Sequence, residues 1–315
     1  MIKKQIHKKI AESLLIGGLL LTGAGCSTTP YITTATSTQT SQPQYKAQYL
    51  DETSISTSSD DTPENLLIVL SPHFDDAVLS LGGYISDFQG PKFVVTFFSS
   101  VPDSLDGLTK WDDMSGFDKS SDSRKIREKE NTNSLQSLGA KIINKSYIDN
   151  QYEMRSELDK TVLVSSITDD IKQIINSRAN YNLTVIGPAY FGEENTHADH
   201  LLVSKSLMQV AKDKTYSNTR FYFYEDEPYT QKKFAGEEIT LDKMLTDFYP
   251  GLQLTKREVP ISKYGFDSKI KGIELYKSQE HAFHVKMENI IQEVTDYAMS
   301  RCIDIKPCEV IYEIK

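Results

Sequence analysis

This 315-residue sequence has few cysteines and histidines, only three Cys and six His. It also lacks a net positive charge, since its formal net charge is −9 at pH 7. The acidic balance provides no basic face suited to a phosphate backbone, so we expect no nucleic-acid partner. No C-x-x-C pair is present, which argues against a dithiol redox centre. Hydrophobic residues nevertheless make up 38% of the chain. They are sufficient for a sizeable core and exclude wholesale disorder.

The apolar run at residues 14–25 is too short to span a bilayer as a stable helix. It follows a basic segment and ends in small residues, which is the pattern of a secretory signal peptide. The ending Gly-Ala-Gly-Cys resembles a bacterial lipobox, although Gly23 stands where Leu is usual. We therefore expect residues 1–25 to be a lipoprotein signal peptide and Cys26 to be acylated, giving an exported, membrane-anchored protein. The alternative is ordinary cleavage near Gly25, which would release a free protein.

Residues 26–62 are dominated by Ser and Thr. Such a segment buries too little apolar area to offset its ordering entropy, so it is predicted to be a flexible, disordered tether. Residues 63–315 are predicted to form one folded domain. In an oxidising compartment Cys302 and Cys308, near the C-terminus, could close a small disulfide loop. The alternative is two unrelated thiols.

Short apolar runs alternate with amphipathic stretches throughout the predicted domain. Strands are predicted at residues 66–71, 92–100, 140–144, 182–187 and 220–225. Helices are predicted at residues 77–88, 123–138, 155–177 and 198–212. This alternation predicts an α/β fold with a mostly parallel sheet and helices on both faces. A dinucleotide-binding version is disfavoured because no G-x-G-x-x-G follows the first strand.

Two clusters of imidazole and carboxylate groups follow predicted strands, where an open α/β sheet places its ligands. His73 and Asp76 come directly after the first strand, and His200 follows the strand at 182–187 and a loop. A tight turn can bring His73 and Asp76 to one metal ion, with His200 completing the coordination. Imidazole with carboxylate suits zinc or ferrous iron. His281 and His284 have no such context, and we interpret them as one face of a helix.

The remaining polar residues of the two clusters suit catalytic roles. Asp75 can point away from the metal and act as a general base, whereas His197 can donate to an oxyanion. Asp199 can hold a neighbouring imidazole in the required tautomer. The simpler alternative is a capped turn, in which Asp75 and Asp76 only favour a helix N-terminus. The acids of residues 224–229 are either a polar rim or a strand exit, and the sequence leaves both open.

These clusters resemble the signatures of the PIG-L (LmbE-like) de-N-acetylase family. Residues 70–83, LSPHFDDAVLSLGG, resemble its first signature, usually His-Pro-Asp-Asp, and residues 197–200 resemble its second, His-x-Asp-His. Smaller similarities, including LYKSQ at 275–279, extend the resemblance over about residues 65–285. Phe74 departs from the usual Pro, and the approach to His197 is longer and more acidic.

The resemblance implies a Rossmann-like (LmbE-like) fold and a zinc hydrolase, with Fe²⁺ as the alternative metal. Its expected substrate is an N-acetylated amino sugar in an envelope or extracellular glycan. Arg127 matches a substrate contact. The resemblance also implies these roles: metal ligands His73, Asp76 and His200; general base Asp75; oxyanion stabiliser His197; and its tuning partner Asp199.

Two other functions stay open from the sequence. One is a surface carbohydrate-binding lipoprotein that keeps the fold without turnover. The other is a metal amidase for small N-acyl compounds. The presence of every expected catalytic side chain counts against the first of these alternatives.

Overall fold

The computed structural model describes residues 63–102, 107–189, 198–230, 249–287, 289–302, 304 and 306–315. The predicted signal peptide, the tether with Cys26, and His197 lie outside these ranges. Among the described residues, no helix combines the length and the apolar character that a membrane crossing requires.

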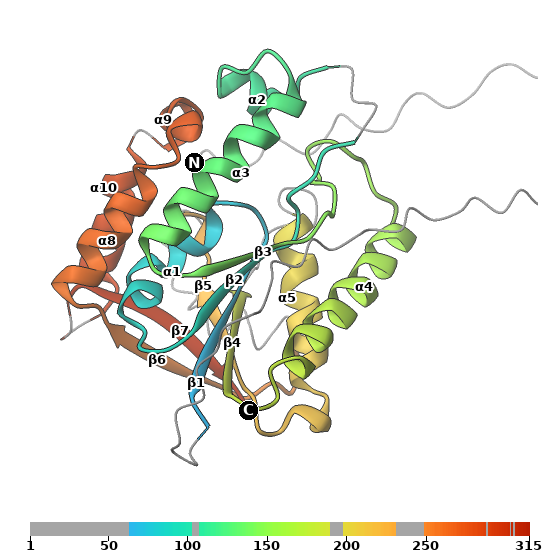
Figure 1. Cartoon of the computed structure of the whole chain (residues 1–315), viewed down its shortest axis with the longest axis vertical. Helices are drawn as coiled ribbons and strands as arrows, with labels where there is room; N and C mark the ends of the chain where they lie inside the picture. Colours follow the sequence, from blue (N-terminus) through green and yellow to red (C-terminus); the bar gives the residue numbers. More distant parts are fainter. Residues whose placement is uncertain are drawn as a thin grey trace, which may run out of the picture. The chain divides into compact units, whose positions relative to one another are not determined.

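Within the described residues, seven strands form one sheet in the order β3-β2-β1-β4-β5-β7-β6 (Figure 1). The strands are β1 (Asn65–Ser71), β2 (Lys92–Thr96), β3 (Lys141–Asn144), β4 (Asn182–Ala189), β5 (Arg220–Glu225), β6 (Leu254–Pro260) and β7 (Cys308–Ile314). The first five strands in this order are parallel, whereas β7 runs antiparallel to both β5 and β6. The predicted mostly parallel α/β fold is therefore confirmed.

Helices cover both faces of the sheet, with α4 and α5 on one side and α1, α3, α8 and α10 on the other (Figure 1). The described helices are α1 (Asp76–Asp87), α2 (Lys110–Met114), α3 (Ser120–Ser137), α4 (Glu157–Asn176), α5 (Ala198–Ala211), α8 (Lys263–Ile273), α9 (Glu280–Met287) and α10 (Ile290–Ser300), with short 3₁₀ turns η1 (Lys214–Tyr216) and η2 (Lys277–Gln279).

Strand β1 shows why the apolar runs predicted strands so well. Leu66, Ile68 and Leu70 belong to the core beneath α4 and α5. The intervening Leu67 and Val69 belong to the core beneath α1 and α3. A strand buried on both faces has no polar positions to alternate with, so it reads as a continuous apolar run.

Two predicted elements differ from the structure by three or more residues at one end. The strand predicted at 92–100 stops at Thr96, because beyond it Phe98 and Ser100 make only isolated bridges. Helix α3 begins at Ser120, three residues before the predicted start. Strands β6 and β7 were not predicted; β6 has a polar sequence with no buried position, as an edge strand allows.

Cys302 and Cys308 form a disulfide in the structure, and both are buried. Cys308 is the first residue of β7, and Cys302 follows the end of α10. The bridge therefore ties the last helix to the strand that enters the sheet beside β5.

A buried ion pair supports a kink in α1, where Leu81 leaves helical geometry (φ −125°, ψ 16°). The Glu309 carboxylate accepts the backbone N–H groups of residues 83–84 at 3.1 and 2.8 Å. Lys269 donates to the carbonyl of Ser80 at 3.3 Å and lies 2.7 Å from Glu309. The pair thus satisfies backbone groups on both sides of the kink.

We expect Lys269→Met to lower the free energy of unfolding by about 3–5 kcal/mol, because it leaves the Glu309 carboxylate buried without its cation. Urea denaturation measures the change. Lys263→Met, on the same helix, is the matched control: its pair with Asp267 is exposed, with 87% of the Lys263 side chain accessible. The control should cost less than about 1 kcal/mol. Equal losses would show that the buried pair does not support α1.

Candidate active site

The turn after β1 is held by hydrogen bonds within itself. Ser71 Oγ donates to the carbonyl of His73 (2.6 Å) and accepts the N–H of Ala77 (3.1 Å). The backbone N–H of His73 donates to Asp76 Oδ2 (2.7 Å). As a result, His73 Nδ1 lies 3.3 Å from the same carboxylate oxygen. The sequence His-x-x-Asp therefore brings imidazole and carboxylate together, as predicted.

His200, in the first turn of α5, reaches this pair from the neighbouring strand β4. Its Nε2 lies 3.2 Å from His73 Nδ1 and 3.5 Å from Asp76 Oδ2. The three ligand atoms lie within 4.8 Å of one another. Two imidazole nitrogens and one carboxylate are a donor set typical of zinc, with room for water as a further ligand. The residues present therefore fit a divalent metal ion.

Outer carboxylates fix which nitrogen of each imidazole faces this centre. His73 Nε2 lies 3.0 Å from Asp199 Oδ2, and His200 Nδ1 lies 2.5 Å from Asp226 Oδ2. The carboxylates turn the opposite nitrogens, His73 Nδ1 and His200 Nε2, toward the metal position. The imidazole that Asp199 contacts among the described residues is that of His73.

A second group, formed by His73, Asp149 and Asp199, also brings three ligand atoms together. Asp199 is already engaged there, because it accepts hydrogen bonds from Arg155 and from the N–H of Asn150. Because Asp199 already pairs with the Arg155 guanidinium, it is better suited to orient the His73 imidazole than to bind a metal ion. Of the two groups, His73 with Asp76 and His200 is therefore the one better placed to hold a metal ion.

Burial and acidic neighbours shift the protonation of both imidazoles. Burial by itself lowers the pKa of His73, but Asp149, Asp199 and Asp76 together raise it well above the usual value. The pKa of His200 is raised in the same way, because Asp226 and Asp76 outweigh its burial. The surrounding carboxylates thus favour the protonated form of both imidazoles. A divalent cation would neutralise the same negative charge.

Asp75 does not cap the helix that it precedes, since its side chain makes no capping hydrogen bond with α1. It is buried, and burial raises the pKa of its carboxyl, although the Arg127 guanidinium counteracts part of that shift. Arg127 Nη2 lies 3.9 Å from Asp75 Oδ2, and the guanidinium lies over the Phe74 ring. A carboxylate with raised proton affinity beside a metal centre suits a general base.

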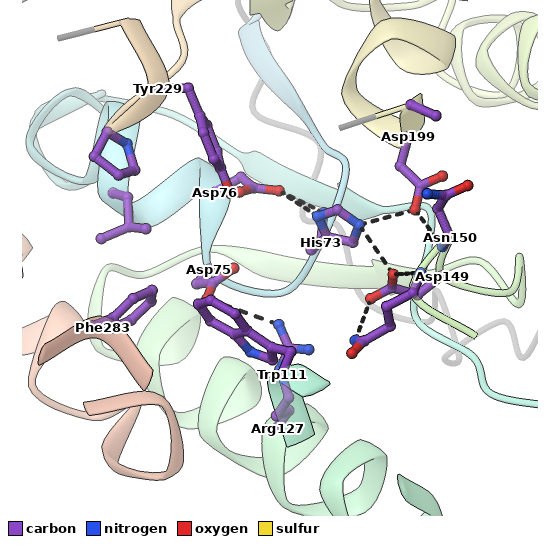
Figure 2. A pocket seen from close by; sticks show the side chains of 14 residues that line it. His73, Asp75, Asp76, Trp111, Arg127, Asp149, Asn150, Asp199, Tyr229 and Phe283 are labelled. Carbon is purple, nitrogen blue, oxygen red and sulfur yellow. Dashed lines mark hydrogen bonds and ion pairs between the residues drawn. The ribbon is translucent and has the colours of Figure 1, made fainter. Parts of the chain in front are cut away.

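The two clusters open onto one cavity of about 220 Å³. Figure 2 shows Asp75 and Asp76 on one side of His73, and Asp149 and Asp199 on the other. The predicted site residues that line the cavity are His73, Asp75, Asp76, Arg127 and Asp199. The structure therefore brings them to one place, with Arg127 beside Asp75.

Other predicted and unpredicted residues complete the description. The catalytic role of His197, outside the described ranges, stays a prediction. His281 is exposed on α9, as expected for a helix face. Sequence reasoning missed Asp226, Asp149 and Arg155. Of these, only Asp226 could have been found from the sequence. It follows β5, which lies next to β4 in the sheet, and it belongs to the acidic segment at residues 224–229 that the sequence left undecided.

Fold and site together define an α/β protein with a His-Asp-His metal-type centre at the carboxyl ends of parallel strands. Residues 68–211 match the family model described as PIG-L, GlcNAc-PI de-N-acetylase. This part of the chain therefore matches the PIG-L family, and the resemblance predicted from its two signatures is confirmed. No curated protein sequence matches the chain.

Solved structures share the fold. The zinc-inhibited form of teicoplanin deacetylase Orf2 is 20% identical, covers 79% of this chain and 98% of its own, and has a TM-score of 0.66. The pseudoaglycone deacetylase Dbv21 is 20% identical, covers 81% of this chain and 98% of its own, and has a TM-score of 0.65. At these identities the likeness concerns the fold.

We expect metal content to distinguish ligands from the residues that orient them. His200→Ala should abolish binding of about one zinc ion per chain, because it removes one of three protein ligands. Asp226→Asn should keep the site but weaken metal affinity about 10–100-fold, since it loosens the His200 imidazole. Elemental analysis and chelator competition measure both effects.

His281→Ala is the matched histidine control and should bind metal as the unmodified protein does. Full metal content in His200→Ala would refute the assigned centre. Loss of metal from His281→Ala would mean that the ion binds elsewhere.

Proposed function

We propose that this protein is a metal-dependent hydrolase that removes the N-acetyl group from an N-acetylated amino sugar. The observation that carries the proposal is the convergence of His73, Asp76 and His200 beside a cavity that His73, Asp75 and Asp76 line. The PIG-L domain supports the reaction class. Solved structures of the same fold bear the names of deacetylases, which agrees with it.

His73 Nδ1, Asp76 and His200 Nε2 would hold the ion, zinc in the first instance and Fe²⁺ as the alternative. When bound, such an ion supplies a Lewis acid that polarises the acetamide carbonyl and acidifies water. Asp199 and Asp226 keep the two imidazoles in the tautomers that bind it.

The chain's own residues then move the protons. Asp75 accepts a proton on its carboxylate from the attacking water, and it can return that proton to the amine nitrogen as the C–N bond breaks. Arg127, beside Asp75, stabilises the carboxylate before attack. His197 is proposed to donate to the oxygen of the tetrahedral intermediate, the role given to it by the family signature.

We further propose that the protein is exported and acylated at Cys26, which would bring the active site to envelope or extracellular glycans. The signal-peptide pattern of residues 1–25 supports export. The disulfide between Cys302 and Cys308 agrees with an oxidising compartment. Retention of a Cys26→Ser variant in the membrane fraction would contradict the anchor.

Asp75→Asn should retain the metal ion and lower turnover about 10²–10⁴-fold, because the amide cannot accept the proton of the attacking water. Acetate release from N-acetylated amino sugars measures turnover. Asp213→Asn, at a surface acid paired with Lys172, is the control and should be fully active. Near-normal turnover in Asp75→Asn would remove Asp75 from the role of base. A metal-loaded protein that releases no acetate from any amino sugar would contradict the proposed reaction.

A further inference from the structure

The cavity beside the metal centre has an aromatic wall and a polar wall. Trp111, Tyr229 and Phe283 form the aromatic side, whereas residues 149–151 form the polar side. Trp111 and Asp75 line the same cavity, and Figure 2 shows Asp149 and Asn150 on the other side of His73 from Asp75. We propose that Trp111 determines substrate specificity by stacking its indole on a pyranose ring whose acetamido group points at Asp75. This proposal rests on the proposed deacetylase function and names the ring that the site selects.

The short helix α2 that carries Trp111 is tied to the rest of the domain at both ends. Its N-cap Thr109 accepts the N–H of Asp112 (3.1 Å) and donates to Gln151 Oε1 (2.6 Å), on the polar wall. Asp112 is fully buried and accepts hydrogen bonds from Ser123 (2.6 Å) and the Tyr152 hydroxyl (2.8 Å). A helix of five residues is not stable on its own. These contacts therefore fix its place at the cavity.

The indole itself is held in one orientation. Trp111 Nε1 donates to the buried Gln279 Oε1 at 2.6 Å, and the Phe283 ring packs edge-to-face against it with centroids 5.9 Å apart. The indole N–H is satisfied by protein, so the part of the ring left to a ligand is apolar. Trp111 is half-buried: it packs against the core and also lines the cavity.

The two walls together match a sugar ring. A pyranose has a C–H face that packs on an aromatic ring and a rim of hydroxyls that needs hydrogen-bond partners. The rim would face Asp149, Asn150 and Gln151. An acyclic N-acyl compound offers the same acetamide without a face for Trp111, so the proposal favours an amino sugar over a small amide.

The chain contains one Trp, so its fluorescence reports on this wall alone. The experiment titrates metal-loaded Asp75→Asn protein with N-acetylglucosamine, N-acetylgalactosamine and, as an acyclic control, N-acetylethanolamine. We expect a saturable change in emission with at least one sugar and none with the control at equal concentration. No change with any of the sugars, or an equal change with N-acetylethanolamine, would overturn the proposal.

Acetate release by the unmodified enzyme keeps the two proposals separate. A sugar that changes the emission but yields no acetate supports the stacking site and contradicts the deacetylase. A sugar that yields acetate but leaves the emission unchanged supports the deacetylase and contradicts the stacking site.

Two variants test stacking against mere bulk. Trp111→Leu keeps an apolar side chain without an aromatic face and should lower kcat/KM for the sugar about tenfold relative to N-acetylethanolamine, mainly through KM; tenfold corresponds to about 1.4 kcal/mol. Trp111→Phe keeps an aromatic face and should stay within about threefold of the unmodified enzyme. Metal content verifies that both variants fold. Equal losses on the sugar and the acyclic amide would show that Trp111 only supports the structure.

Discussion

The protein is organised around a buried surplus of negative charge. Asp75, Asp76, Asp199 and Asp226 are all at most 6% exposed, and they surround two imidazoles. Burying carboxylates is unfavourable unless cations or hydrogen-bond donors compensate them. Two arginines, the backbone N–H groups of the turn after β1 and the imidazoles provide part of that compensation. A divalent ion between His73 and His200 would provide the rest, so the buried negative charge that is costly for folding also suits the site to a metal ion.

The fold brings these charged residues together because three parallel strands end side by side. Strand β1 contributes the turn with His73, β4 leads toward His200, and β5 leads to Asp226. The strand order reverses between β1 and β4, which is where ligands bind in open α/β sheets. Ser80 Oγ in α1 accepts the N–H of Glu227 (3.1 Å), so the helix behind Asp76 also fixes the loop that carries Asp226.

Residues inside and beyond the family match build both the proposed metal centre and the walls of the cavity. The family match ends at residue 211 and contains the proposed metal ligands and the base. Beyond that match, Asp226 orients His200, Tyr229 and Phe283 join the aromatic wall, and Gln279 holds the Trp111 indole. The Trp111 indole and the polar residues 149–151 lie within the match, so the proposed chemistry and the proposed selectivity both depend on contacts across its boundary.

The sequence by itself determined the central strands, the helices that flank them and the residues of both signatures. Strands buried on both faces are continuously apolar, and His73 and Asp76 meet through a turn of only four residues, so both signals are local. Only the tertiary structure decided the contacts of Asp226, Arg155 and Trp111, and the places of β6 and β7. The partners of these residues lie far away in the sequence. An edge strand such as β6 has no apolar pattern from which it could be predicted. The sequence could not show contacts between segments that are far apart in the chain. An aspartate or a tryptophan acquires its particular environment only when folding brings its partners beside it.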